Sequence, residues 1–97
     1  MGYQFAGVSG THEAERLTTQ YERVWEIMRD GHWRALWDIA IHTQHRFHKR
    51  DSEAAISARL RDFRKERNGA HTVERRRRQV GNGWEYRVIV NDVSHGA

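Results

Sequence analysis

The sequence predicts a small α+β domain in which three helices precede a two-stranded β-hairpin. Capped amphipathic stripes predict helices that begin after Thr19 and near Ser52. After Asn68-Gly69 the apolar pattern changes from a period of about 3.6 residues to a period of 2. A chain of 97 residues holds one core. We therefore expect a flexible arm at 1–17, one domain at 18–90 and a disordered tail at 91–97.

The first helix begins at a capping box. The Thr19 hydroxyl can accept the backbone N–H of Glu22, whose side chain can bond back to Thr19. An apolar stripe follows at i, i+3, i+4 and i+7, made of Tyr21, Val24, Trp25 and Met28. Asp30-Gly31 then predicts the end of this helix.

A second, shorter helix is expected after a brief extended segment. Residues 32–34 leave room for a short strand near residue 33. Leu36, Ile39 and Ala40 then predict a helix that ends near Thr43. The stretch 42–50 is polar and basic without a period, which favours a long loop. Ala35 lacks the side-chain oxygen of a usual N-cap.

The third helix is predicted over 52–67, with Asp51 or Ser52 as its cap. At 100° per residue, Ile56, Leu60 and Phe63 form the stripe that faces the core. The opposite face is small near its start and cationic further along, which suits close approach to a polyanion. Its members are Ala54, Ser57, Ala58, Arg61, Arg64 and Lys65.

Two β-leaning runs, 71–80 and 84–90, surround Gly81-Asn82-Gly83, and Asn-Gly is a strong hairpin signal. With Asn82-Gly83 at the centre of the turn, Arg75 and Arg77 share a face with Trp84 and Tyr86. Arg76, Arg78 and Arg87 then share the other face. A slip of one residue would reverse these faces, so the sequence leaves open which arginines point outward.

Charge is divided unevenly along the chain. Residues 1–45 carry 4 Arg against 6 acidic residues, whereas residues 46–97 carry 13 Lys or Arg against 7. A basic second half favours a polyanionic partner. Arginine outnumbers lysine, which fits bidentate phosphate binding and equally fits codon bias in a GC-rich genome.

The run Arg75, Arg76, Arg77 and Arg78 is the sharpest single feature. Four adjacent guanidinium groups repel one another unless a polyanion neutralises them, which favours phosphate contact. The alternative is a solvated edge strand whose charges prevent aggregation.

Other chemistries have weaker support. Cysteine is absent, and no nucleophile with a base, carboxylate pair or phosphate-binding glycine loop stands out, so we expect neither an enzyme nor a cofactor. His42, His45 and His48 are spaced as metal ligands but lack a supporting Cys or buried carboxylate, which favours a polar loop. Trp25, Trp33, Trp37 and Trp84 could stack on bases, although their aliphatic neighbours favour the core.

Two segments resemble a known family. Leu36-Trp37-Asp38-Ile39-Ala40 followed by 56–64 is similar to the paired helices of bacterial and phage winged helix-turn-helix DNA-binding domains. The segments 72–76 and 84–88 look like the two strands of the wing. The resemblance covers about 18–90 and implies that the third helix enters the major groove. It also implies that Ser57 and Arg61 face bases, and that Arg59 braces the turn or touches phosphate.

These observations together predict a double-stranded DNA-binding protein. We expect a transcription regulator or an excisionase-like recombination factor, of phage or prophage type, that acts in the bacterial cytoplasm or nucleoid. A homodimer is compatible with this role. The alternative is a winged-helix module that docks on a host or partner protein. Residues 1–10 lack the pattern of a signal peptide, and no stretch is long enough to span a membrane.

Overall fold

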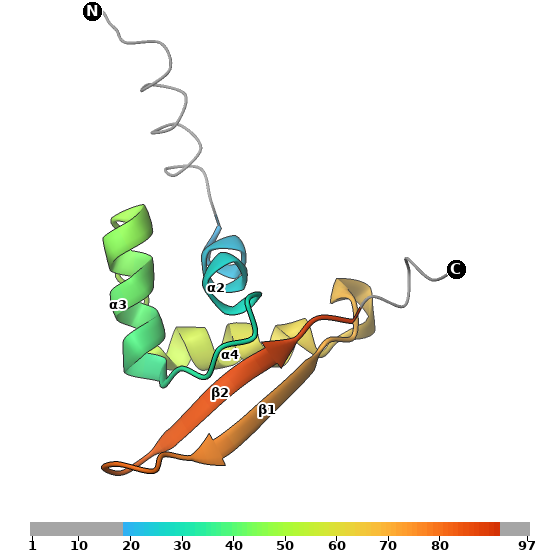
Figure 1. Ribbon diagram of the computed structural model, residues 1–97. Coiled ribbons are helices and arrows are strands. Elements are labelled where there is room, and N and C mark those ends of the chain that lie inside the picture. The colour runs from blue at the N-terminus through green and yellow to red at the C-terminus, as the bar shows by residue number, and fades with distance from the viewer. Residues whose placement is uncertain (1–18, 92–97) are drawn as a thin grey trace, which may run out of the picture.

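The computed structural model describes residues 19–91 and confirms the α+β layout. The helices are α2 (Gln20–Met28), α3 (Leu36–Phe47) and α4 (Glu53–Phe63), followed by the short 3₁₀ helix η1 (Glu66–Asn68). The strands β1 (Thr72–Arg77) and β2 (Trp84–Ile89) form one antiparallel hairpin. Figure 1 shows this hairpin lying beside α4, with α2 and α3 on the other side of that helix. This arrangement is consistent with a winged helix.

The capping box at the start of α2 is confirmed. The Thr19 hydroxyl accepts the Glu22 N–H at 3.1 Å, and the Thr19 N–H donates to the Glu22 carboxylate at 2.9 Å. Val24 and Met28 of the predicted stripe are buried, and Ile27 is buried beside them. These contacts fix one face of α2 against the core.

Helix α3 is longer than the sequence pattern indicated. The helix continues to Phe47, so the predicted loop at 42–50 is wrong. The reason is that Thr43 and Phe47 continue the buried face begun by Ile39. Ala35 is the N-cap without a side-chain hydrogen bond, and His48 ends the helix in the left-handed conformation at φ 61°. The connection to α4 is therefore a short turn.

Helix α4 ends four residues before its predicted limit at Arg67. Ser52 caps it by accepting the Ala55 N–H at 3.1 Å, and Ile56, Leu60 and Phe63 are all buried. After Phe63 the chain turns through η1 and reaches Gly69 at φ 108°. The His71 N–H then donates to the Phe63 carbonyl at 2.9 Å, which brings β1 back along α4.

The hairpin has the predicted faces but a wider loop. Arg75 pairs with Tyr86 and Arg77 with Trp84. The Arg78 N–H donates to the Gly83 carbonyl at 3.1 Å and closes the loop. The prediction of a two-residue turn centred on Asn82-Gly83 is therefore wrong. The observed register differs from the expected one by an even number of residues, and the side-chain faces are therefore unchanged.

The short strand expected near residue 33 is present as a single β-bridge. Arg34 and Tyr86 exchange two backbone hydrogen bonds, each of 2.8 Å. This bridge ties the segment before α3 to the free side of β2. It therefore fixes the hairpin relative to the helices.

The core lies where the three helices meet β2. Phe63 is completely buried, and the rings of Tyr21 and Trp25 approach it edge-on at 5.0 and 5.2 Å. Val88 contributes the hairpin's buried side chain. Within the described part of the chain, no helix is long and apolar enough to cross a bilayer. The predicted arm at 1–17 and the tail beyond Asn91 lie outside the described residues.

Candidate nucleic-acid interface

A buried ion pair holds the turn that leads into α4. Arg23 of α2 contacts the Asp51 carboxylate through Nε at 3.1 Å and Nη2 at 2.7 Å. Both residues are buried, and Gln20 adds a third hydrogen bond to Asp51. Burial opposes ionisation of Asp51, but the hydrogen bonds from Arg23 and Gln20 outweigh it and lower its pKa. The start of α4 is thereby anchored to α2.

Arg59 adds a second brace between α4 and α2. Its Nη1 donates to the Gln20 side chain at 3.3 Å, and its Nε lies 2.9 Å from the Asp62 carboxylate. Arg59 thus joins α4 to α2 through Gln20.

The predicted outer face of α4 is accessible. Ala54, Arg61, Arg64 and Lys65 are exposed, and Ser57 and Ala58 are half-buried. Lys65 lies beyond the end of the helix, where its Nζ is 2.9 Å from the Asp62 carboxylate. The Lys65 hydrogen bond, with Arg59 and Arg67 nearby, lowers the pKa of Asp62. Lys65 is thus partly neutralised, whereas Arg61 and Arg64 contact no carboxylate of the described chain.

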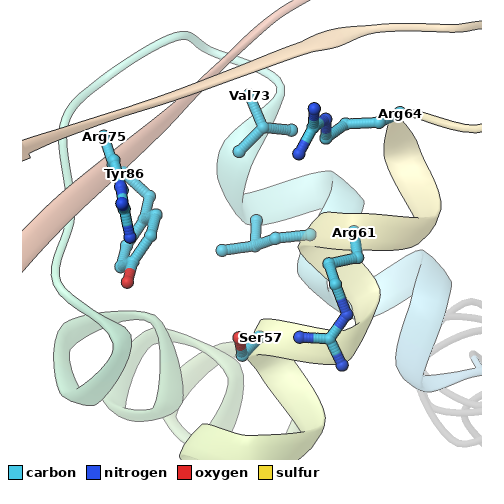
Figure 2. Close-up of a pocket in the computed structure, with 7 residues that line it drawn as sticks. Ser57, Arg61, Arg64, Val73, Arg75 and Tyr86 are labelled. Atoms are coloured by element: carbon cyan, nitrogen blue, oxygen red, sulfur yellow. The ribbon is translucent and has the colours of Figure 1, made fainter.

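A groove of about 410 Å³ runs between α4 and the hairpin. We call it the arginine groove, and it is lined by Ser57, Leu60, Arg61, Arg64, Val73, Arg75 and Tyr86. Figure 2 shows side chains from α4 on one side of this hollow and Arg75 and Tyr86 on the other. The hydroxyls of Ser57 and Tyr86 have no hydrogen-bond partner within residues 19–91. The polar lining therefore consists of hydroxyls and guanidinium donors, without a carboxylate.

The structure separates the four wing arginines by face. Arg75 and Arg77 lie on the face shared with Trp84, with their Cζ atoms 4.5 and 5.1 Å from its ring centroid. Neither of them has a carboxylate within salt-bridge distance among the described residues. Their charges are available to an anion from outside the domain.

The arginines of the opposite face are already neutralised. Arg76 Nε lies 3.0 Å from the Glu85 carboxylate, and Arg87 Nη2 lies 2.7 Å from that of Glu74. The two guanidinium groups also contact the ring of Trp33, at 4.2 and 4.7 Å from its centroid. Arg78 is half-buried, lies 3.9 Å from Glu85 and contacts Trp37. The sequence signal for these pairs is the i, i+2 spacing of Glu74 with Arg76 and of Glu85 with Arg87, which places all four on one face, and the register then sets them opposite one another.

The aromatic residues differ from expectation. Trp37 and Trp84 are 45% and 38% exposed, so the prediction that they belong to the core is wrong. Trp25 does pack against the core, whereas Trp33 lies under two guanidinium groups. Tyr86 was not among the predicted site residues, although it lines the groove.

The predicted histidine loop is part of a helix instead. His42 and His45 lie within α3, and His48 is its C-cap. His42 Nε2 is 3.6 Å from the Asp38 carboxylate one turn earlier. Within the described chain, no group of three or more His, Cys, Asp or Glu is placed to hold a metal ion.

Comparison with protein-family models, curated protein sequences and solved structures gives no match. The family resemblance therefore stays a prediction.

Proposed function

We propose that this chain binds double-stranded DNA, with the exposed face of α4 in the major groove and the hairpin on the adjacent backbone or minor groove. The observation that carries the proposal is the arginine groove. It is lined by Arg61 of α4, Arg64 at the C-cap of that helix and Arg75 of β1, none of which has a carboxylate partner in the described chain. Unpaired guanidinium groups from two elements suit successive phosphates of a nucleic-acid backbone.

The two groups of wing arginines take different roles in this proposal. Arg75 and Arg77 contact phosphate, whereas Arg76 and Arg87 mainly stabilise the hairpin through Glu85 and Glu74. Arg61, with Ser57 one turn before it, is the candidate for base contact, since a bidentate arginine prefers guanine. Ala54 and Ala58 allow the helix to approach the bases closely.

This function fits a transcription regulator or an excisionase-like recombination factor that acts where the DNA is, in the bacterial cytoplasm. Selecting the bound sequences from a pool of random DNA duplexes would define the preferred DNA site. A palindromic consensus would indicate that two copies bind together.

The charge-matched pair of double variants Arg75→Ala/Arg77→Ala and Arg76→Ala/Arg87→Ala tests the proposal. Both remove two positive charges from the hairpin, but only the first removes those without a carboxylate partner. We expect the first to weaken binding to duplex fragments at low salt by at least about tenfold, and the second to weaken it much less. Arg61→Ala should cost about 1–3 kcal/mol on the preferred site and relax its specificity.

Unchanged affinity in Arg61→Ala and in both double variants would contradict DNA binding through this surface. An equal loss in the two double variants would show that only net charge matters. The protein-docking alternative predicts a different result, in which one partner protein is recovered stoichiometrically after nuclease treatment and duplex is not bound. The exposed Ile41 on α3, one turn after Trp37, is the feature that would favour it.

A further inference from the structure

A second, smaller hollow adjoins the arginine groove. It has a volume of about 160 Å³ and lies between the starts of α3 and α4 and the hairpin loop. Figure 1 shows the loop that joins β1 to β2 near the start of α3. We call this hollow the tryptophan pocket, and its main side chains are Leu36, Trp37, Glu53, Arg78, Asn82 and Trp84. Tyr86 lines both hollows, so the two lie next to each other.

Two large indoles remain accessible in this pocket. Trp37 is 45% exposed and Trp84 is 38% exposed, whereas Trp25 packs on the core. Indole rings usually bury most of their area, and accessible aromatic surface next to a charged groove indicates a binding site. The pocket is smaller than the ~300 Å³ at which sites for drug-sized ligands begin, which suits one flat ring system.

Both indoles already stack with planar cations. Arg78 Cζ lies 5.4 Å from the Trp37 ring centroid, and Arg75 Cζ lies 4.5 Å from that of Trp84. A nucleobase stacks on an indole more strongly than an exposed guanidinium group does. An incoming base can therefore displace an arginine, and the displaced guanidinium remains close to the phosphate of the same nucleotide.

The polar groups of the pocket fit the edge of a base. Glu53 offers acceptors, Arg78 offers donors and the Asn82 amide offers both. Glu53 forms no ion pair with the described residues. An extended acidic peptide would meet this carboxylate, whereas the exocyclic amino group of a base would donate to it.

We propose that the tryptophan pocket takes one unstacked nucleobase from the DNA that lies in the arginine groove. This inference rests on the proposed function and adds a preference to it. DNA with an unpaired nucleotide should bind more tightly than the same DNA fully paired, because its base need not be unstacked first.

Three duplexes of about two helical turns test the proposal. One is fully paired, one carries a single-nucleotide bulge, and one carries the same bulge without its base. The measured quantity is the ratio of bulged to paired affinity. For the wild-type protein we expect a ratio on the order of ten, falling toward one for the bulge that lacks a base.

Variants then locate the effect. Trp84→Ala and Trp37→Ala should each lower the ratio several-fold, and Trp84→Phe should keep most of it because the phenyl ring still stacks. Trp33→Ala is the matched control, since Trp33 contacts arginines of the opposite hairpin face, and it should leave the ratio unchanged. Thermal unfolding followed by circular dichroism verifies that each variant folds.

The outcomes separate this inference from the proposed function. Equal wild-type affinity for the paired and bulged duplexes, or for the bulges with and without a base, overturns the pocket while DNA binding stands. If the paired duplex does not bind, the proposed function fails, and a short single strand then decides the pocket by tryptophan fluorescence. If the single strand quenches the fluorescence of the wild-type protein but not that of Trp84→Ala, the pocket is supported. If it does not quench the wild-type fluorescence, the pocket is overturned.

Discussion

Arg23 and Asp51 form a buried ion pair that joins α2 to the turn before α4, with Nη2 2.7 Å from Oδ1. The pair lies 28 residues apart in sequence. It fixes the start of the helix that carries Ser57 and Arg61. The orientation of the proposed DNA-reading surface therefore depends on two charges that are removed from solvent.

Breaking this pair should be costly. Arg23→Met leaves the Asp51 carboxylate buried without its main partner, and we expect a loss of about 3 kcal/mol in the free energy of unfolding. Urea denaturation measures it. Arg29→Ala is the control, because Arg29 forms an exposed pair with Glu26 and should change stability by less than about 0.5 kcal/mol. Similar losses in the two variants would contradict the role of the buried pair.

Acid should weaken the link between α2 and α3. Arg34 donates two hydrogen bonds to the Asp30 carboxylate and lowers the pKa of Asp30 to about 2, from an ordinary value of 3.8. Ionised Asp30 therefore stabilises the fold above about pH 4, and this contribution is lost as the pH falls toward 2. Because Asp30 is 40% exposed, solvent screening reduces the expected contribution to about 1 kcal/mol.

Asp30→Asn tests this dependence. The variant should be less stable than the wild-type protein at pH 7, and the difference should shrink below pH 4. Urea titrations at several pH values follow it. A difference that stays constant with pH would show that the carboxylate charge is not the cause.

Two glycines with positive φ should differ in their tolerance of alanine. Gly69 and Gly83 have φ of 108° and 102°, so a Cβ is strained at both positions. At Gly69 it would also lie 2.5 Å from Nε2 of His71, whereas at Gly83 nothing lies within 4 Å. The His71 ring is held by the Asn91 N–H at 2.9 Å and by Trp25. Gly69→Ala should therefore destabilise the protein by at least about 1 kcal/mol more than Gly83→Ala in thermal unfolding; equal losses would mean that the His71 ring moves aside freely.

DNA affinity should depend steeply on salt. If Arg64, Arg75 and Arg77, with or without Arg61, contact three or four phosphates, a plot of the logarithm of affinity against the logarithm of salt concentration should have a slope of about −2.7 to −3.6. Fluorescence anisotropy over a salt series measures the slope. Arg75→Ala/Arg77→Ala should reduce its magnitude by about 2 and Arg76→Ala/Arg87→Ala by much less. A slope near zero would exclude phosphate contacts as the source of affinity.

Much of the fold could be predicted because its local signals agree with one another. The capping box at Thr19, the cap at Ser52 and the stripe of Ile56, Leu60 and Phe63 all appear as expected. The predicted end of α3 near Thr43 was wrong, because the polar residues that follow hid a buried stripe that continues to Phe47. The predicted two-residue turn was wrong, because Asn82-Gly83 lies within a longer loop that the hydrogen bond between Arg78 and Gly83 closes.

The candidate site was harder to predict than the fold. The sequence marks Arg75, Arg76, Arg77 and Arg78 as one cluster, yet pairing with Glu85 divides it, and that division depends on the register. Exposure of Trp37 and Trp84 could not be predicted from aliphatic neighbours, since burial depends on which face of each element meets the core. In both cases the outcome depends on contacts with residues that are distant in the sequence.

Successive side chains of β1 point to opposite faces of the hairpin, so the position of each arginine along the strand decides its face. Deleting one residue between Thr72 and Arg75 would exchange its two faces without altering its arginine content. The arginines now paired with glutamates would then point toward α4, and the free ones would point toward Trp33. Each face would still carry two arginines, because the four stand in a row along the strand. The shift would change which of them meet Glu85, so the position of the glutamates, rather than the number of arginines, decides which guanidinium groups lack a carboxylate partner.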